Sequence, residues 1–205
     1  MKLVPILFIS ICSIIACSCG PEGNDHVVTI KTPKGEIVAI LYDETPKHKQ
    51  NFIKLANEHF FDSTLFHRVI QGVIIQGGDP ESKSATAGQP LGKGGPGYTI
   101  DAEFNPKFSH ERGALAAARL GDSENPKKAS SGSQFYIVEA SGIPDLDGDY
   151  TIFGKVIKGI DVVDMIAVLP TGPNDRPLDD IRMTITVEEL PKKSIEKLYG
   201  YDYEQ

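Results

Sequence analysis

FHRVIQGVIIQGGDP, residues 66–80, is the stretch that decides how this chain of 205 residues folds. Apolar and β-branched residues dominate on both sides of Gln71-Gly72, and this pattern predicts two strands, 65–70 and 73–76, joined by a turn. The whole chain contains 20 glycines and 14 prolines, which favours a turn-rich β protein over a helical bundle.

Side chains alternate between the two faces of a strand. On this alternation Phe66, Arg68 and Ile70 share one face, and Ile74 and Gln76 share a face of the second strand. An arginine and a glutamine flanked by aliphatic side chains make an apolar surface that carries two strong hydrogen-bond donors. The same pattern also describes an arginine that pairs with a carboxylate on a barrel wall. The alternation by itself leaves both interpretations open.

Outward from this stretch, the same strand-like pattern recurs along the chain. It predicts eight strands, at residues 27–32, 36–42, 65–70, 73–76, 114–120, 134–139, 151–157 and 181–187. Only two helices are predicted. One begins at Thr45-Pro46, with the threonine as N-cap and the proline at the first helical position, and the other spans 160–167. Eight strands and two helices indicate a mainly β protein built as a closed antiparallel barrel.

The composition predicts one folded domain, over residues 26–190. Hydrophobic residues make up 40% of the chain, which is enough to bury a core. The longest predicted loop, 77–97, has seven glycines and three prolines, and loops of this length are commonly functional. Residues 191–205 are charged and contain tyrosines, and we expect them to form an appendage. The net charge of −7 and the lack of a Lys/Arg cluster exclude a nucleic-acid partner.

Each candidate motif for a metal or cofactor site lacks a required feature. GKGGPG at 92–97 fits a dinucleotide-binding spacing, but it neither follows a strand nor opens a helix. Asp145–Asp149 begins like a calcium loop, yet Val156 stands where the final glutamate belongs. The five histidines lack metal-ligand spacing, and no Gly-x-Ser-x-Gly motif occurs. We therefore expect neither a metal site nor a cofactor.

The N-terminus differs in composition from the rest of the chain. Met1-Lys2 is followed by an uncharged apolar run, residues 3–16, which is shorter than the roughly 20 residues that span a bilayer. Its length suits the apolar region of a signal peptide, and we interpret residues 1–16 as one. All three cysteines of the chain lie at its end, at positions 12, 17 and 19, so the domain that follows contains no disulfide.

Ile14-Ile15-Ala16-Cys17 resembles a bacterial lipobox, in which the cysteine becomes the lipidated first residue of the mature chain. Cys19 is a weaker alternative, and an ordinary secreted protein cut near this point is another. Residues 17–25 then form the lipidated N-terminus and a linker. We expect a protein anchored in the cell envelope on the extracytoplasmic side, whose only membrane contact is its lipid.

Residues 66–80 also resemble the signature of the cyclophilin family of peptidyl-prolyl cis-trans isomerases. Four further blocks match this family in the same order, at residues 94–104, 113–119, 132–137 and 146–156. The resemblance spans roughly residues 26–190. It implies an eight-stranded antiparallel barrel capped by two helices, which agrees with the strand count.

The resemblance assigns roles residue by residue. Arg68 falls on the catalytic arginine of the family and Gln76 on the neighbouring glutamine. The residues expected to bind substrate are Phe66, Val73, Ile74, Ala118, Arg119, Gln134, Phe135, Tyr136, Leu146 and Tyr150. Val73 and Ile74 stand where many members have Phe and Met, and Tyr136 stands where Phe is frequent. The expected proline pocket is therefore more aliphatic than usual.

The function implied is isomerisation of X-Pro peptide bonds in unfolded or partly folded exported proteins, by a monomer. Arg68 would stabilise the twisted amide, a reaction that requires neither nucleophile nor metal. A non-catalytic module that binds proline peptides, or a chaperone, on the same barrel is the alternative. An extracellular solute-binding lipoprotein is disfavoured, because the chain is short and lacks a two-domain α/β pattern.

Overall fold

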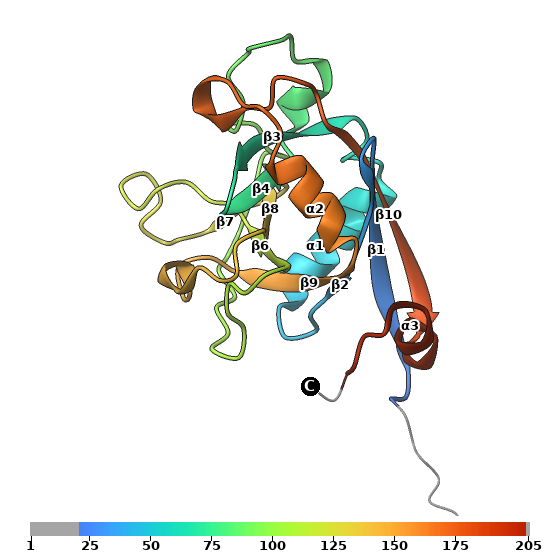
Figure 1. The fold of residues 1–205 in the computed structure, drawn as a ribbon. Coiled ribbons are helices and arrows are strands. Elements are labelled where there is room, and N and C mark those ends of the chain that lie inside the picture. The colour runs from blue at the N-terminus through green and yellow to red at the C-terminus, as the bar shows by residue number, and fades with distance from the viewer. Residues whose placement is uncertain (1–20, 204–205) are drawn as a thin grey trace, which may run out of the picture.

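The fold is a closed barrel of eight strands, seen in a computed structural model that describes residues 21–203. The barrel strands are β1 (Asn24–Thr32), β2 (Gly35–Leu41), β3 (Thr64–Ile70), β4 (Ile74–Gly77), β6 (Ala114–Ala117), β8 (Phe135–Val138), β9 (Ile152–Lys158) and β10 (Arg182–Pro191). They pair antiparallel in the closed order β1-β10-β3-β4-β8-β6-β9-β2 (Figure 1). The predicted eight-stranded antiparallel barrel is confirmed. A separate pair, β5 (Thr99–Ile100) and β7 (Ser130–Ser131), joins two of the long loops.

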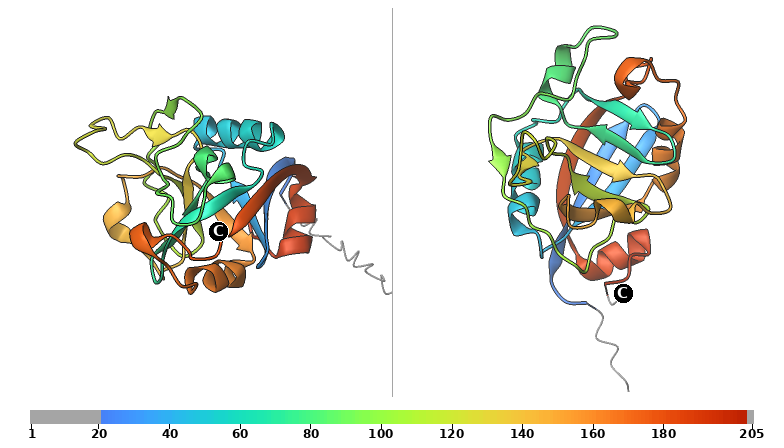
Figure 2. Two further views of the ribbon diagram at one scale, coloured as in Figure 1. Left: turned by 90° about the horizontal axis from the view of Figure 1, so that it is seen from above. Right: turned by 90° about the vertical axis from the view of Figure 1, so that its left-hand side faces the viewer.

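Two helices cover the barrel on opposite sides, α1 (Pro46–Asn57) and α2 (Ile160–Ala167) (Figure 2). Thr45 is the N-cap residue of α1, as predicted, but its side chain makes no capping hydrogen bond. Glu103 does this instead, because its carboxylate accepts the backbone N–H groups of Lys47 and His48, both at 3.0 Å. A distant loop thus supplies the negative group that a helix N-terminus favours.

A third helix, α3 (Lys192–Tyr199), lies in the segment expected to be an appendage. It lies beside β1 and β10, close to the point where the described chain begins (Figure 1). Ile195 is fully buried against Val27, Val38 and Ile40 on the outer surface of the barrel. β10 is longer than predicted, since its pairing with β1 continues to Pro191, directly before this helix.

Aromatic rings fill the barrel interior together with aliphatic side chains from both capping helices. Phe52 of α1 lies 4.9 Å from Phe61 and 5.4 Å from Phe135, measured between ring centroids. Phe66 meets Phe135 edge-on at 6.2 Å. Such tilted and edge-on contacts are the preferred geometries of aromatic pairs and add to the burial free energy. The interior is therefore a packed hydrophobic core.

A bulge in β3 changes the predicted alternation. Phe66 pairs with Gly77, but Arg68 pairs with Gln76, so His67 is an extra residue in the strand. Phe66 consequently points into the barrel core while Arg68 lies on the outer surface. The prediction that Phe66 and Arg68 share a face is wrong for this reason. Gly77 permits the close pairing, since a Cβ there would lie 2.9 Å from the backbone carbonyl oxygen of Leu65.

The long loop after β4 is organised around a buried carboxylate. Asp79 is fully buried and caps the short 3₁₀ helix η1 (Pro80–Ser84) by accepting the N–H of Glu81 at 2.8 Å. Its other oxygen accepts the N–H of Gly92 at 2.6 Å, which fixes the far end of the loop. Among residues 21–203 no helix is long and apolar enough to cross a membrane, and no cluster of metal-ligating side chains occurs.

Candidate active site

A groove of about 640 Å³ runs over the outer face of β3, β4, β8 and β6. Nine of the residues predicted to bind substrate or to catalyse line it: Arg68, Val73, Ile74, Gln76, Ala118, Arg119, Tyr136, Leu146 and Tyr150. The expectation that Ile74 and Gln76 share a face agrees with this arrangement, because Ile75 between them points into the core. The structure thus brings together side chains from five separate parts of the sequence.

One part of the groove is apolar and rests on a hydrophobic cluster distinct from the barrel interior. Ile74, Ala118 and Tyr136 are buried members of this cluster, and Val73 and Leu146 pack against it from the rim. The neighbouring strands β6 and β8 both contribute to this cluster. The small alanine side chains of β6 leave space for the larger side chains of β8. The arrangement can hold a small apolar ring and exclude water from its surroundings.

A chain of amide hydrogen bonds positions Arg68. Its Nη1 donates to Gln76 Oε1 at 3.3 Å, and Gln76 Nε2 donates to Gln134 Oε1 at 3.1 Å. Gln134 Nε2 in turn donates to the backbone carbonyl of Gly94 at 2.7 Å. Because a carbonyl only accepts, this last contact fixes the orientation of both glutamines. Gln76 therefore presents its oxygen to the guanidinium.

Arg119 has a structural role at the other end of the groove. Its side chain is only 4% exposed, and its Nε donates to the carbonyl of Asp149 at 2.7 Å. The guanidinium carbon lies 4.5 Å from the ring centroid of Tyr150, a cation–π distance. Arg119 also pairs with Asp122 at 2.7 Å. These contacts hold Tyr150 in place and leave Arg68 as the more exposed arginine of the groove.

A buried relay stands behind the pocket ring of Tyr136. Its hydroxyl lies 2.8 Å from His110 Nε2, and His110 Nδ1 lies 2.6 Å from Asp147 Oδ1. An ionised carboxylate can only accept, so Nδ1 carries the proton and Nε2 accepts from the Tyr136 hydroxyl. Burial lowers the pKa of His110, against the opposing effect of Asp147, and burial raises the pKa of Tyr136. Both groups are therefore neutral near pH 7.

Comparisons with known proteins give this geometry its context. Residues 27–188 match the family described as cyclophilin type peptidyl-prolyl cis-trans isomerase/CLD. The chain belongs to this family. Peptidyl-prolyl cis-trans isomerase CYP18-1 of Arabidopsis thaliana is 41% identical over 170 residues, covering 80% of this chain and 97% of the relative. Peptidyl-prolyl cis-trans isomerase B of Streptomyces anulatus is 37% identical over 180 residues, covering 78% and 95%.

Solved structures agree with the assignment. A cyclophilin type peptidyl-prolyl cis-trans isomerase of Cryptosporidium parvum superposes with a TM-score of 0.70 at 33% identity, covering 81% of this chain and 98% of that one. A second structure of that protein, in the presence of the dipeptide Ala-Pro, gives a TM-score of 0.69 at 33% identity, covering 79% and 98%. This cyclophilin is therefore an isomerase with the fold of its family.

Three predicted substrate-binding residues do not line the groove. Phe66 and Phe135 are each 1% exposed and lie in the barrel interior of this cyclophilin, so they support the groove from below. For Phe66 the cause is the bulge, and for Phe135 it is ordinary alternation, because its neighbour Tyr136 faces outward. Gln134 acts through Gln76 and does not line the groove surface.

Several groove residues were not predicted from the sequence. His67, Asp175 and Arg176 line the part of the groove beyond Arg68, next to the loop at 88–92. His110 supports Tyr136 from behind. A histidine next to the signature arginine was visible in the sequence, but no local pattern links the loop at 173–176 to β3. That proximity arises only when β10 closes the barrel.

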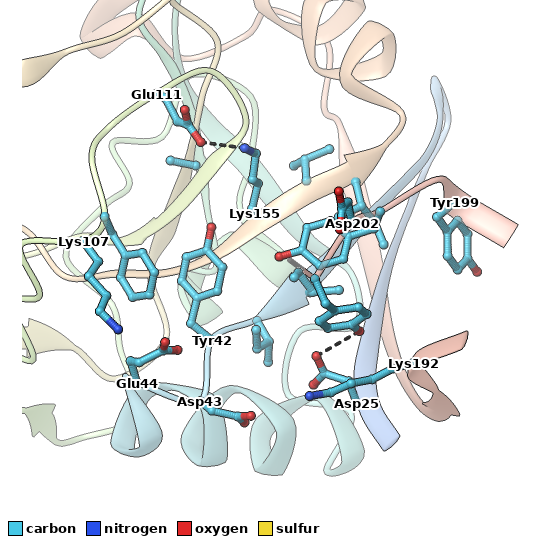
Figure 3. Close-up of a pocket in the computed structure, with 18 of the residues that line it drawn as sticks. Asp25, Tyr42, Asp43, Glu44, Lys107, Glu111, Lys155, Lys192, Tyr199 and Asp202 are labelled. Carbon is cyan, nitrogen blue, oxygen red and sulfur yellow. Dashed lines mark hydrogen bonds and ion pairs between the residues drawn. The ribbon is translucent and has the colours of Figure 1, made fainter. Parts of the chain in front are cut away.

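A larger cavity, of about 820 Å³, lies apart from Arg68 and contains none of the predicted site residues. It opens between the C-terminal segment and the barrel, and Figure 3 shows Tyr42, Lys107 and Glu44 on one side of it and Asp25, Lys192 and Tyr199 on the other. Its lining consists of side chains of both charges and of tyrosines. Several of them interact with one another, and the Tyr203 hydroxyl, for example, donates a hydrogen bond to Asp25 at 3.2 Å. The predicted site residues that line a cavity are therefore found in the smaller groove.

Proposed function

We propose that Arg68 is the catalytic residue of this cyclophilin and that its clients are exported proteins. Rotation about an X-Pro bond is slow because amide resonance gives the C–N bond partial double-bond character. The twisted amide has a nitrogen lone pair that the planar forms lack. A guanidinium that donates a hydrogen bond to this nitrogen stabilises the twisted state more than either planar state, which lowers the barrier.

The position of Arg68 supports this role. The guanidinium lies at the edge of the apolar cluster, and its side chain is 43% exposed, so a bound peptide can reach it. Gln76 occupies one side of the guanidinium, and the fixed amide chain behind Gln76 limits its movement. An arginine stays charged at all accessible pH values and its planar fork is preorganised.

The apolar part of the groove fits the proline ring. Val73, Ile74 and Leu146 would contact the ring, with Tyr136 behind them, while Ala118 would hold the residue before proline. The groove then holds the residue on one side of the peptide bond in place while the residue on the other side rotates. The Ala-Pro dipeptide used with the Cryptosporidium parvum relative is consistent with proline-containing substrates. The single observation that carries the proposal is Arg68 beside this apolar pocket.

Activity measurements on an arginine variant test the mechanism. We expect Arg68→Ala to lower kcat/KM for an X-Pro peptide at least about a hundredfold, which corresponds to about 2.7 kcal/mol of transition-state stabilisation. The matched control is Arg112→Ala, because Arg112 lies outside the groove and pairs with Asp164 on the surface. A folded Arg68→Ala protein with the activity of the Arg112→Ala control would refute the role of Arg68.

We also propose that this cyclophilin is a lipid-anchored monomer of the cell envelope. Cys17 and the apolar run before it lie outside the described residues, so the proposal rests on the sequence. The first strand starts at Asn24, which leaves a short tether between Cys17 and the barrel. Cys17→Ser is expected to abolish recovery of the mature protein in the membrane fraction, whereas Cys19→Ser retains it. The reverse result would assign the lipid to Cys19.

A further inference from the structure

The groove continues beyond Arg68 into a second lobe that is chemically unlike the proline pocket. We define this distal lobe by His67 at its base, the loop 88–92 on one wall and the loop 173–176 on the other. None of these residues belongs to the hydrophobic cluster under the proline pocket. Arg68 stands between the two lobes, since it contacts Gln76 on one side and Asp175 on the other.

A buried arginine holds the two walls of the distal lobe together. The side chain of Arg176 is 8% exposed, and its Nη1 donates to the carbonyls of Thr86 and Gln89 at 3.0 and 2.6 Å. Its Nη2 pairs with Asp180 at 3.0 Å. The charge of Arg176 is therefore already satisfied by the protein, and its function in the lobe is to fix the loops.

The backbone of the second wall is held in an uncommon conformation. Asn174 and Asp175 have φ angles of 59° and 57°, in the left-handed region that residues other than glycine rarely adopt. Such conformations persist when the surroundings enforce them, and they concentrate at functional sites. In this conformation the Asp175 carboxylate lies 3.5 Å from Arg68 Nε, and the Asp175 side chain is 49% exposed.

The base of the lobe carries a buried polar group without a partner. His67 is 3% exposed, and neither of its ring nitrogens has a hydrogen-bond partner within residues 21–203. Burial lowers the pKa of His67, so the neutral ring offers one donor and one acceptor near pH 7. A buried polar group without a hydrogen-bond partner lowers the stability of the folded protein. Its presence under a substrate groove therefore points to a functional role.

The walls of the lobe match a long side chain with a charged end. Pro90, Leu91 and Pro173 provide apolar surface, and Asp175 provides the negative charge. Lysine and arginine side chains lay their methylene stems along such surfaces and keep the cationic group at a polar site. An acidic side chain would instead meet the Asp175 carboxylate as a like charge, and a short apolar one would leave the wall uncovered.

The strand order defines which substrate residue reaches the distal lobe. Along the barrel the order is β3, β4, β8 and β6, with Arg68 on β3 and Ala118, at the pre-proline wall, directly after β6. The loop that carries Asp175 lies on the opposite side, against β3. A peptide whose pre-proline residue lies over β6 and β8 therefore runs past Arg68 toward the distal lobe.

We propose that the distal lobe binds the side chain that follows proline and that Asp175 makes it selective for lysine or arginine at this position. This inference rests on the proposed isomerase function of the same groove. The Asp175 carboxylate is shared between Arg68 and the incoming cation. Half-exposed ion pairs contribute only modestly to binding free energy. The preference for lysine or arginine after proline is therefore expected to be several-fold and to weaken as salt is added.

The test compares three peptides, Ala-Ala-Pro-Lys-Ala and its Leu and Glu counterparts. Magnetisation-exchange NMR on the purified protein measures catalysed cis–trans exchange directly and avoids a coupling protease with its own sequence preference. At low salt we expect kcat/KM for the Lys peptide to exceed that for the Glu peptide at least about fivefold. The ratio is the measured quantity because it cancels any general loss of activity in a variant.

Two variants assign the preference to Asp175. Asp175→Asn tolerates the same backbone conformation and is expected to bring the Lys/Glu ratio close to 1, and Asp175→Lys is expected to invert it. Asp179→Asn is the matched control, since it removes the same charge from an exposed position on the same connection outside the groove, and it should retain the wild-type ratio.

The possible failures are distinguishable. Wild-type protein that accelerates all three peptides equally, or an Asp175→Asn protein that keeps the wild-type ratio, would overturn the distal lobe while leaving isomerase activity intact. Wild-type protein that accelerates none of the peptides would refute the proposed function and the lobe with it. A ratio that falls equally in Asp175→Asn and Asp179→Asn would attribute the preference to net charge and overturn the assignment to Asp175.

Discussion

At the scale of single residues, the groove is controlled by side chains behind the ones that would touch substrate. Gln134 fixes Gln76 through the carbonyl of Gly94, and Gln76 in turn orients Arg68. Neutral amides are suited to this position because they hold the guanidinium without neutralising its charge. In the same way His110 holds Tyr136 from behind. Each of these contacts is a hydrogen bond with a defined direction, so each can be tested alone.

The Tyr136 hydroxyl gives the first test. Tyr136→Phe keeps the pocket ring but leaves His110 Nε2 buried without a donor, and we expect the free energy of unfolding to fall by about 1–3 kcal/mol. Tyr150→Phe is the control, because the Tyr150 hydroxyl makes no hydrogen bond within residues 21–203 and its loss should change stability by less than about 0.5 kcal/mol. Urea unfolding measures both. Equal stability of the two variants would contradict the relay.

At the scale of elements, the β3 bulge and α3 each place groups that regular structure would not. The bulge at His67 turns Phe66 into the core and leaves Arg68 on the surface, where β4 supplies Gln76. A regular strand in this register would put Phe66 in the groove and remove its ring from the hydrophobic core. The α3 helix covers apolar outer surface of β1 and β2, which a barrel of this composition would otherwise expose.

The contribution of α3 can be measured with one buried and one exposed position. Ile195 is 0% exposed, and we expect Ile195→Ala to lower the free energy of unfolding by about 2–4 kcal/mol, through lost burial and the cavity that remains. Leu198 on the same helix is 60% exposed, so Leu198→Ala should cost well under 1 kcal/mol. Chemical denaturation compares the two. An Ile195→Ala protein as stable as Leu198→Ala would show that α3 is dispensable to the barrel.

At the scale of the whole molecule, stability depends on histidines that the fold keeps neutral. His48, His67 and His110 are each at most 3% exposed, and burial lowers the pKa of all three. The unfolded chain binds protons at these sites below about pH 6.5, whereas the folded protein resists protonation. The unfolded state therefore binds more protons in this range, so stability is highest above pH 6.5 and falls as the pH decreases.

This linkage predicts a pH dependence with a known sign. Between pH 7.5 and 5.5 the free energy of unfolding should decrease as the solution is acidified, by at most about 1.4 kcal/mol per pH unit for each histidine. His67→Gln removes one of these titrating groups and should flatten the slope. Urea titrations at several pH values give the slopes. A His67→Gln slope as steep as that of wild type would exclude His67 as a contributor.

Much of this fold could be predicted from the sequence, because its signals are local. The β-branched runs, their turns and the period-two alternation of residues 181–187 predict the eight strands and the closed barrel that the structure has. The ordered blocks around residues 66–80 predict the family, and nine of twelve predicted side chains line one groove. The proposed signal peptide and Cys17 lie outside the described residues and remain predictions.

Tertiary structure alone decided the remaining features, because they depend on contacts between distant segments. The bulge at His67 shows only in the pairing of β3 with β4, where the register shifts between Phe66 and Arg68. His110 reaches Tyr136, and Asp175 reaches Arg68, only once the barrel has closed. Local patterns report the direction in which a side chain points relative to its neighbours in sequence. Which charge it then meets is set by the packing of loops whose sequences carry no periodic signal, and this packing builds the distal lobe.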